Sequence, residues 1–324
     1  MPPFFPGTGD TESSSLSGAV KSRMAHVVHL THNDLDAVGS DAIHRMKYGQ
    51  EGVFTIWSSV KRFLPLFSIV AACEGKGDML SISDLGYQKD AESIAARARA
   101  NGWRVEWRDH HRWQDGEIGK TRAAVDLLRI DTSACATGIV ARDLQEGNPV
   151  AAEVGRVVCD YDLWKQTDPR SAVLGQVLQR KINREHVRDC LVHGIFSDER
   201  IESQYTDIRR EMRAMMRKSL RNATVLGKKY RIAFAPLYGY PSETAHFIRA
   251  ELHTDMEVII GRDGKFSLRS VPPVGHLIAR EFNGGGHPNA SGGSFNFTVI
   301  ERFTFWLFKK TRYFDTFVKV AESY

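Results

Sequence analysis

The chain has 324 residues, of which 42% are hydrophobic and 26% charged, and it carries a formal net charge of +5 at pH 7. This composition excludes a disordered, collagen-like or disulfide-rich protein, and no apolar run reaches the roughly 18 residues that a membrane helix needs. The length suffices for two domains with separate cores, so we expect a globular cytoplasmic protein that has no contact with a membrane.

The first 23 residues are rich in Pro, Gly, Ser and Thr and lack the apolar core of a secretory signal. We therefore expect a disordered tail at residues 1–23. The cysteines are far apart in sequence and show no paired spacing; they are Cys73, Cys135, Cys159 and Cys190. This pattern indicates reduced thiols rather than a zinc site or a disulfide framework.

Short apolar strands alternate with helical stretches from residue 24 to about residue 187, the pattern of a parallel sheet covered by helices. In chain order, we expect strands at 27–30, 63–73, 79–83, 105–107 and 157–159, and helices at 42–46, 90–100 and 133–144. A helical linker is expected at 188–225, followed by a second α/β domain at 226–324. The expected elements of that domain are strands at 230–236, 256–261 and 266–269 and a helix at 274–282.

Two further segments carry information about what the protein binds. Residues 201–226 have helical periodicity and are rich in Lys and Arg, which favours a polyanionic substrate; a solvated helix face is the alternative. The aromatic segment 303–317 is expected to pack against the second domain, with a partner surface as the alternative. The sequence leaves a homodimer open.

Three polar side chains follow the first predicted strand within five residues: His32, Asp34 and Asp36. Side chains alternate along an extended segment, so all three are expected on one side of the chain. Such a row is costly unless a cation neutralises it. The alternative is that Asp36 or Ser40 is a helix N-cap and His32 is a surface residue, which explains one of the two carboxylates and leaves the other unexplained.

Asp109, His110 and His111 form a second polar cluster after a β-prone segment. Neutral imidazole is a good ligand for Mn, Fe and Zn, so one histidine can bind a metal while the other contacts a substrate oxygen. The alternative is a polar turn between Trp107 and Trp113.

Two more predicted strands end in carboxylates, at Asp84 and at the pair Asp160 and Asp162. Taken singly, each is commonly a cap or turn residue. Four strand ends that each deliver Asp or His supply together enough oxygen and nitrogen ligands for two divalent ions that share a carboxylate.

Gly284, Gly285, Gly286 and His287 form a glycine-rich segment after the predicted helix 274–282. Glycine permits positive φ, so backbone N–H groups can point at an anion, and His287 adds a side-chain donor. We therefore expect a phosphate contact here, with a flexible linker as the alternative. Arg269, at the end of a predicted strand, is a further candidate for substrate contact.

These motifs, in this order, resemble those of the DHH phosphoesterase family with a C-terminal DHHA1 domain, over about residues 26–295. The compact first motif, with one residue between His32 and Asp34, is similar to the oligoribonuclease or nanoRNase-like subgroup. The resemblance implies an α/β fold: a parallel-sheet DHH domain joined by a helical linker to a smaller α/β DHHA1 domain with a mixed sheet.

The resemblance also implies two divalent metal ions, with Mn²⁺ expected and Mg²⁺ or Co²⁺ as alternatives. The ligands of one ion would be His32, Asp34 and Asp84. The ligands of the other would be Asp36, Asp84, His110 and either Asp160 or Asp162, between which the sequence does not choose. The residues implied in catalysis are Asp84, His110 and His111, the last facing the scissile phosphate. Gly284, Gly285, Gly286 and His287 would hold a phosphate or a terminal nucleotide.

The expected activity is that of an exonuclease-type phosphodiesterase, which hydrolyses short single-stranded RNA or DNA oligonucleotides with a metal-activated water. A phosphodiesterase for cyclic mono- or dinucleotides, or a phosphatase for 3′-phosphoadenosine 5′-phosphate, is the alternative. A nucleotide-binding protein without catalysis is the least favoured hypothesis, because every expected ligand type is present.

Overall fold

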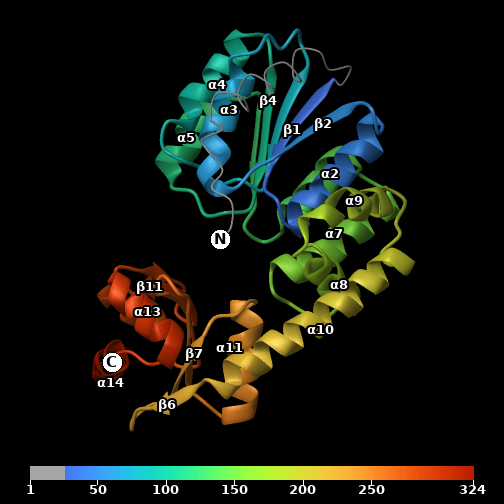
Figure 1. Cartoon of the computed structure of the whole chain (residues 1–324). Helices are drawn as coiled ribbons and strands as arrows, with labels where there is room; N and C mark the ends of the chain where they lie inside the picture. Colours follow the sequence, from blue (N-terminus) through green and yellow to red (C-terminus); the bar gives the residue numbers. More distant parts are fainter. Residues whose placement is uncertain (1–25) are drawn as a thin grey trace. The chain divides into compact units, whose positions relative to one another are not determined.

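The structure is a computed structural model and describes residues 26–324 (Figure 1). The tail expected at residues 1–23 lies outside the described residues. Two compact units divide between Tyr205 and Thr206, within helix α10 (Glu199–Arg221). The expected domain bounds, at 187 and 225, stay a prediction. Within residues 26–324 no helix combines the length and apolar character that crossing a bilayer requires.

The first unit is built on a five-stranded parallel sheet with the order β2-β1-β3-β4-β5. Its strands are β1 (Val27–Thr31), β2 (Val53–Trp57), β3 (Met79–Ser83), β4 (Arg104–Asp109) and β5 (Leu127–Ile130). The chain leaves β1 toward β2 on one side and later returns to β3 on the other. The strand order therefore reverses between β1 and β3, and ligands bind at such a switch point in open α/β sheets.

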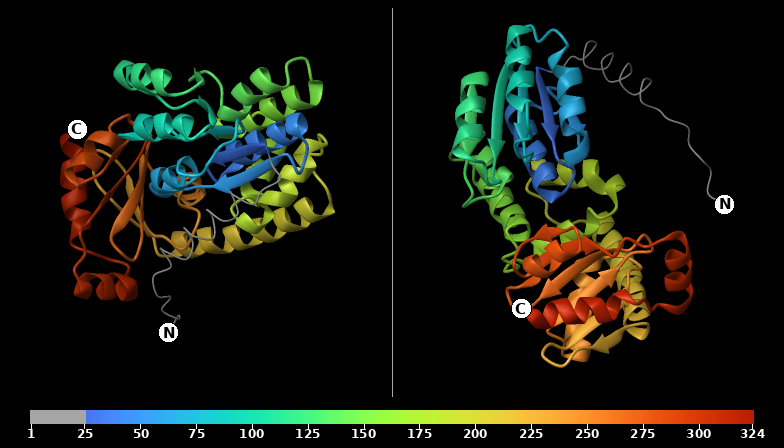
Figure 2. Two further views of the ribbon diagram at one scale, coloured as in Figure 1. Left: turned by 90° about the horizontal axis from the view of Figure 1, so that it is seen from above. Right: turned by 90° about the vertical axis from the view of Figure 1, so that its left-hand side faces the viewer.

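Helices cover both faces of this sheet (Figures 1 and 2), with α3, α4 and α5 on one face and α2 and α6 on the other, where α7 and α9 pack on the outside of α2 and α6. Their bounds are α2 (Leu35–Tyr48), α3 (Phe63–Ala71), α4 (Ala91–Ala100), α5 (Asp115–Ala124), α6 (Ala136–Leu144), α7 (Pro149–Asp162), α8 (Pro169–Val177) and α9 (Arg184–Val192). Short 3-10 helices occupy Val60–Arg62 and Lys181–Asn183. The parallel α/β architecture predicted from the sequence is therefore confirmed.

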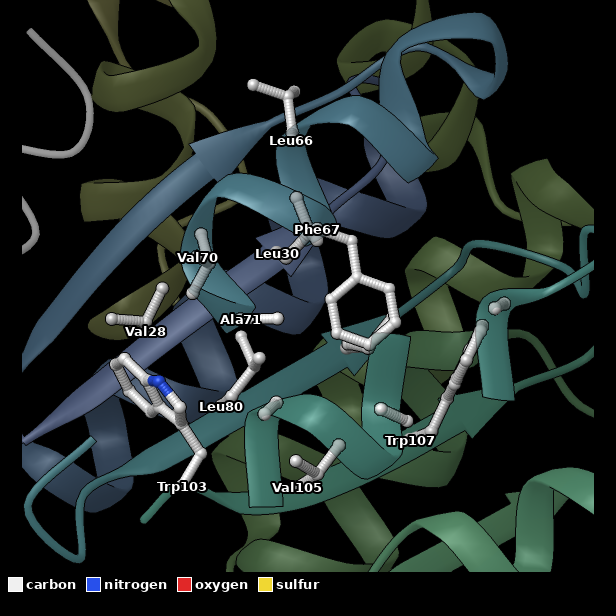
Figure 3. Packing of buried hydrophobic residues seen from close by; sticks show 14 of the residues in the cluster. Val28, Leu30, Leu66, Phe67, Val70, Ala71, Leu80, Trp103, Val105 and Trp107 are labelled. Carbon is white, nitrogen blue, oxygen red and sulfur yellow. The ribbon is translucent and has the colours of Figure 1, made fainter. Parts of the chain in front are cut away.

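The two faces of the sheet have different chemistry, although both are buried. Apolar strand residues pack against α3 and α4 (Figure 3); they include Val28, Leu30, Leu80, Ile82, Val105 and Trp107. The residues that alternate with them are polar and also buried: His29, Thr31, Ser81, Ser83, Glu106 and Arg108. Buried polar groups need hydrogen-bond partners, and α2 supplies two of them. Asp41 lies 3.0 Å from His29, and His44 lies 2.8 Å from Ser81.

The segment 63–73, predicted as a buried strand, is instead the helix α3 (Phe63–Ala71). Its buried residues Phe63, Phe67 and Val70 follow the three- and four-residue spacing of one helix face. Pro65 is compatible with this helix because it lies in the first turn, where a backbone N–H has no intrahelical partner.

The segment 157–159, also predicted as a strand, belongs to the helix α7 (Pro149–Asp162). Asn148 caps this helix by accepting from Val150 N at 3.0 Å, and Pro149 occupies its first turn. The short apolar run was misleading because it is the end of a longer helical pattern.

Cys135 and Cys159 form a disulfide, so the expectation of four reduced thiols is wrong for this pair. Cys135 immediately precedes α6 and Cys159 lies in the last turns of α7, two helices that pack against each other. Their separation of 24 residues carries no sequence signal for pairing. Cys73 and Cys190 are buried and keep reduced thiols, as expected.

The second unit contains a six-stranded mixed sheet with the order β10-β11-β9-β8-β7-β6. Only the β7–β8 pair is parallel among these described strands. The strands are β6 (Thr224–Leu226), β7 (Ile232–Pro236), β8 (Met256–Ile260), β9 (Lys265–Ser270), β10 (Gly285–Gly286) and β11 (Ala290–Ser294). The helices are α11 (Pro241–Leu252), α12 (Gly275–Glu281), α13 (Val299–Phe308) and α14 (Tyr313–Ser323). The predicted mixed α/β domain is confirmed.

The aromatic segment 303–317 packs into this unit only in part. Phe305, Phe314 and Phe317 are buried in its core. Three other aromatic residues of α13 remain 61%, 43% and 65% exposed: Phe303, Trp306 and Phe308. The expected packing is therefore wrong for the outer face of α13.

Candidate metal centre

Three neighbouring strands end at the same level, which brings the motifs that follow them together. Thr31, Ser83 and Arg108 are in register across β1, β3 and β4. Residues just beyond these positions therefore emerge side by side at the carboxyl edge of the sheet. Three groups have ligand atoms within 4.8 Å of one another: His32, Asp34 and Asp84; Asp36, His110 and Asp162; and Asp84, His110 and His111.

Asp34 uses its two carboxylate oxygens for different purposes. Oδ1 caps α2 by accepting from Ala37 N at 3.2 Å, and Oδ2 lies 2.6 Å from His32 Nδ1. Burial alone would raise the pKa of Asp34, but the hydrogen bond and charge of His32 outweigh it and bring the pKa to about 2. The N-cap of α2 is therefore Asp34 and not Asp36 or Ser40, and it uses one carboxylate oxygen while the other faces the cluster.

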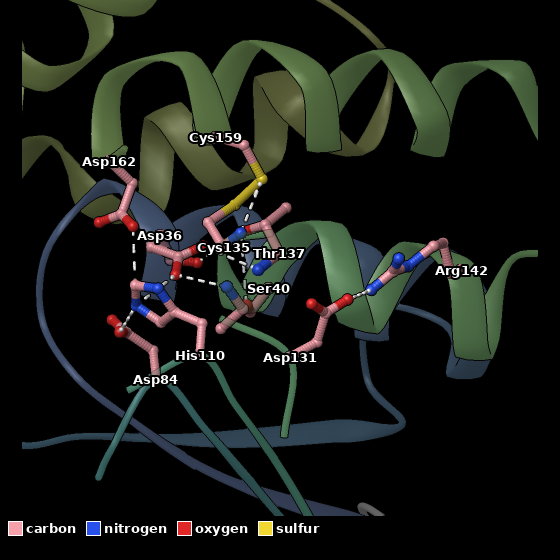
Figure 4. Close-up of a disulfide and its surroundings, with 11 residues drawn as sticks. Asp36, Ser40, Asp84, His110, Asp131, Cys135, Thr137, Arg142, Cys159 and Asp162 are labelled. Atoms are coloured by element: carbon pink, nitrogen blue, oxygen red, sulfur yellow. Dashed lines mark hydrogen bonds and ion pairs between the residues drawn. A yellow bond between two sulfur atoms is a disulfide. The ribbon is translucent and has the colours of Figure 1, made fainter. Parts of the chain in front are cut away.

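Asp36 is held by the first turn of α6. Its carboxylate accepts from Ala136 N and Thr137 N, both at 2.7 Å, and Thr137 Oγ1 donates to the Asp36 carbonyl at 2.6 Å (Figure 4). Gly39 permits this approach of the two helices, because a Cβ there would lie 2.6 Å from Thr137 Oγ1. Burial, followed by the charge of Asp162, raises the pKa of Asp36 well above its usual value.

Asp84 lies at the centre of the cluster in a backbone conformation that is unusual for its residue type. Its φ of 54° is in the left-handed region, which costs a non-glycine residue of the order of 1 kcal/mol. Its Oδ1 lies 3.4 Å from His110 Nε2 and its Oδ2 lies 3.7 Å from His32 Nδ1. Burial, then the charges of Asp34 and Asp36, raises the pKa of Asp84 well above its usual value.

The structure brings Asp162 into the cluster and leaves Asp160 outside it. Asp162 Oδ2 lies 3.6 Å from His110 Nε2 (Figure 4). The Asp160 carboxylate instead accepts from Thr167 N at 2.9 Å, Asp168 N at 3.2 Å, Ser171 Oγ at 2.6 Å and the Thr167 hydroxyl. Burial would raise the pKa of Asp160, but these hydrogen bonds outweigh it and lower the pKa to about 2. Asp160 is thus committed to the turn that precedes α8.

His111 lies beside the cluster and is oriented by Asp109. Its Nδ1–H donates to Asp109 Oδ1 at 2.8 Å, while Trp113 Nε1 donates to Asp109 Oδ2 at 2.7 Å. The bond to Asp109 raises the pKa of His111, and its side chain is 53% exposed. The imidazole is therefore fixed at one nitrogen and accessible to a substrate at the other.

Two contributions to this site were missed in the sequence. Asp109 was noted as part of a motif, but not as the residue that orients His111. The amides of Ala136 and Thr137 could not be found, because they lie about 100 residues from Asp36 in the chain and backbone groups carry no sequence signal.

The arrangement has a deficit of positive charge. Within residues 26–324, no hydrogen-bond partner reaches Asp84 Oδ2 or Asp162 Oδ2, although both atoms are buried. Burying an uncompensated carboxylate costs several kcal/mol. Imidazole and carboxylate ligands suit Mn²⁺ and related divalent ions, so the residues present fit a pair of such ions.

The glycine-rich segment of the second unit is more ordered than a free anion-binding loop. Gly284 N donates to Ala279 O at 2.9 Å, and His287 N donates to Ala290 O at 2.8 Å. A Cβ on Gly284 would lie 1.9 Å from Gly292 O, and Gly286 has a φ of 132°. Glycine is therefore required for the β10–β11 pairing, and two of the amides expected to bind phosphate are already engaged.

Two side chains near this segment remain candidates for substrate contact. The His287 side chain is exposed. Arg269 lies opposite Ala290 in the β9–β11 pair and donates to Ser242 Oγ at 2.7 Å.

No protein-family profile and no curated protein matches the chain. Solved structures do match it. An exonuclease RecJ bound to manganese has a TM-score of 0.54 at 15% identity, covering 98% of this chain and 96% of its own. A pGpG-specific phosphodiesterase, PggH from Vibrio cholerae, has a TM-score of 0.55 at 12% identity, covering 87% and 98%. A DHH domain described as a member of a family of ribosomal proteins has a TM-score of 0.50 at 13% identity, covering 92% and 90%. The two-domain fold that the motifs predicted is therefore confirmed.

Replacing a clustered carboxylate by its amide should stabilise the metal-free protein. A raised pKa means that the folded form holds a proton that the unfolded form releases. The free energy of unfolding of the unmodified chain therefore falls as pH rises above about 4. Asp84→Asn and Asp162→Asn should each add about 0.5–2 kcal/mol to the free energy of unfolding at pH 7 in chelator. The gain should shrink as pH falls toward about 4, the usual pKa of an Asp carboxyl, because the unfolded form then also binds the proton.

Asp160→Asn is the matched control, because hydrogen bonds from the folded protein stabilise the charged form of this carboxyl and lower its pKa. It should reduce the free energy of unfolding by about 1–3 kcal/mol at pH 7. Urea denaturation of all variants between pH 4 and 8 measures these differences. If Asp84→Asn were no more stable than the unmodified chain, the charge deficit would be disproved.

Proposed function

We propose that this chain, which has the fold of the DHH-domain proteins, is a metal-dependent phosphodiesterase that hydrolyses short single-stranded oligonucleotides with water. The observation that carries the proposal is the convergence of the three ligand groups around Asp84 at the switch point of the parallel sheet. A nanoRNA-type exonuclease is the specific activity that we favour within this class.

Apart from His111, the residues of these groups divide between two ions. His32, Asp34 and Asp84 would hold one ion. Asp36, Asp84, His110 and Asp162 would hold the other, with Asp84 shared. We propose Mn²⁺ as the metal. When bound, two such ions lower the pKa of a water molecule and neutralise the charge that develops on the phosphate.

The protein's own groups fix this arrangement and handle a proton. The amides of Ala136 and Thr137 hold Asp36 in one orientation, so its position does not depend on a bound ion. The hydrogen bond to Asp109 raises the pKa of His111 and holds its Nδ1, which leaves Nε2 free for a substrate. We propose that His111 binds the scissile phosphate and donates a proton to the leaving oxygen.

For the second unit we propose a role in holding the substrate. His287 would contact a phosphate or terminal nucleotide, with Gly285 and Gly286 permitting close approach and Arg269 supplying positive charge. A Cβ on Gly285 would have no atom within 4 Å, so the backbone is accessible at this position. The Lys- and Arg-rich outer surface of α10 is consistent with a polyanionic ligand.

Within this class of substrates, a linear dinucleotide is the second candidate, because a pGpG-specific phosphodiesterase shares the fold. Cyclic mono- or dinucleotides and 3′-phosphoadenosine 5′-phosphate remain alternatives that the same cluster could accept. Hydrolysis assays decide between them.

The purified chain with Mn²⁺ should hydrolyse a dinucleotide and a five-nucleotide RNA faster than cyclic AMP or 3′-phosphoadenosine 5′-phosphate. Chelator should abolish the activity, and Asp84→Asn should lower kcat/KM by about a thousandfold or more, roughly 4 kcal/mol. Asp131→Asn, which replaces a half-buried carboxylate outside the cluster, is the control. If none of the four compounds were hydrolysed, the proposal would be contradicted. If cyclic AMP alone were hydrolysed, a cyclic nucleotide would replace the oligonucleotide as the proposed substrate.

His287→Ala should raise KM by about tenfold or more and leave kcat nearly unchanged, because a charge-assisted hydrogen bond to phosphate contributes about 1.5–3 kcal/mol. His253→Asn is a suitable control: His253 is exposed in the same unit, and asparagine tolerates its φ of 51°. Steady-state kinetics with the dinucleotide provide the measurement. A lower kcat at unchanged KM would show that His287 does not act in capture.

A further inference from the structure

A second cluster of metal-ligating side chains lies where α9 meets the start of α10, and the proposed phosphodiesterase does not use it. His186 and Cys190 are four residues apart on α9 and so share a face of that helix. Asp198 immediately precedes α10. His186 Nε2 lies 2.7 Å from Asp198 Oδ2, and Cys190 Sγ lies 3.7 Å from His186 Nε2 and 3.5 Å from Asp198 Oδ2.

We propose that His186, Cys190 and Asp198 bind a single Zn²⁺ ion, with water as the fourth ligand. Tetrahedral zinc, with Zn–S of about 2.3 Å and Zn–N or Zn–O of about 2.0–2.1 Å, places its ligand atoms about 3.5 Å apart. Both distances from Cys190 Sγ already have this value. The separation of His186 and Asp198 has to widen by less than about 1 Å, which small side-chain rotations can supply.

Asp198 is oriented for this role by the helix that it precedes. Its Oδ1 accepts from Ile201 N at 2.8 Å, as an N-cap does, so Oδ2 is the oxygen directed at His186 and Cys190. Such outer hydrogen bonds fix the orientation of metal ligands. Cys190 belongs to the same apolar core as the fully buried Val187, Leu191 and Ile201, so the thiol side of the cluster faces the protein interior.

The charges of the cluster balance with one divalent cation. Burial, followed by the charge of Asp198, raises the pKa of Cys190 to about 11, so without a metal the thiol keeps its proton. Binding of Zn²⁺ releases that proton to solvent as the sulfur–zinc bond forms. One thiolate and one carboxylate then neutralise the ion, and neutral imidazole completes the protein ligands.

The thiolate distinguishes this site from the cluster around Asp84, whose ligands are oxygen and nitrogen. Soft sulfur ligands select zinc over manganese and magnesium. The wide spacing of the cysteines predicts no zinc site, but this rule covers only sites built from paired cysteines. A single cysteine with a histidine one helical turn away, as Cys190 and His186 are on α9, also supplies two zinc ligands. The bound ion would fasten the start of α10 to α9.

Cobalt(II) tests this proposal selectively, because a thiolate ligand gives a charge-transfer band in the near ultraviolet that oxygen and nitrogen ligands do not. Titration of the full chain with Co²⁺ should produce this band with one ion per chain, and Zn²⁺ should displace it. Cys190→Ser should remove the band. Cys73→Ser, which replaces the other buried reduced thiol, should retain it.

Asp198→Asn keeps a side-chain oxygen for the cap of α10 but removes the anionic ligand, so folding and metal binding are tested separately. Competition with a chromophoric chelator should show zinc affinity reduced at least tenfold, with an unchanged circular dichroism spectrum. The proposal is overturned if the unmodified chain gives no thiolate–cobalt band, if Cys190→Ser retains it, or if Asp198→Asn binds zinc as tightly as the unmodified chain.

Discussion

The first unit holds four aspartates close together at one edge of its sheet, against the mutual repulsion of their carboxylates. Asp34, Asp36, Asp84 and Asp162 come from three separate segments, and the pKa values of the last three are raised. Such a cluster lowers stability unless cations are present. The fold nevertheless holds it in place through backbone amides, strand register and a left-handed residue, as expected where function requires strain.

The buried polar layer between the sheet and α2 explains how the cluster keeps its shape. His29 connects Ser83, which precedes Asp84, to Asp41 of α2, at 2.7 and 3.0 Å. Since α2 also carries Asp34 at its start, this connection couples the position of the helix to that of the strand end. A purely apolar interface would allow the helix to slide, whereas directional hydrogen bonds fix one register.

The sequence predicted the strand-end ligands well because a period of two and an abrupt change to polar residues are local signals. His32, Asp84 and His110 lie where this reasoning put them relative to β1, β3 and β4. The sequence does not choose between Asp160 and Asp162, since that choice depends on which face of α7 points toward the cluster. The Cys135–Cys159 bond and the amides that hold Asp36 depend on tertiary packing alone, and α3 was mistaken for a strand because its apolar run is short.

The number of manganese ions bound per chain tests the central claim most directly. Calorimetric titration of the chelator-stripped protein, with electron paramagnetic resonance to detect coupling between neighbouring ions, provides it. Our account predicts two coupled Mn²⁺ ions in the unmodified chain and the loss of both in Asp84→Asn, because that carboxylate is shared. A single uncoupled ion, or two ions retained by Asp84→Asn, would contradict it.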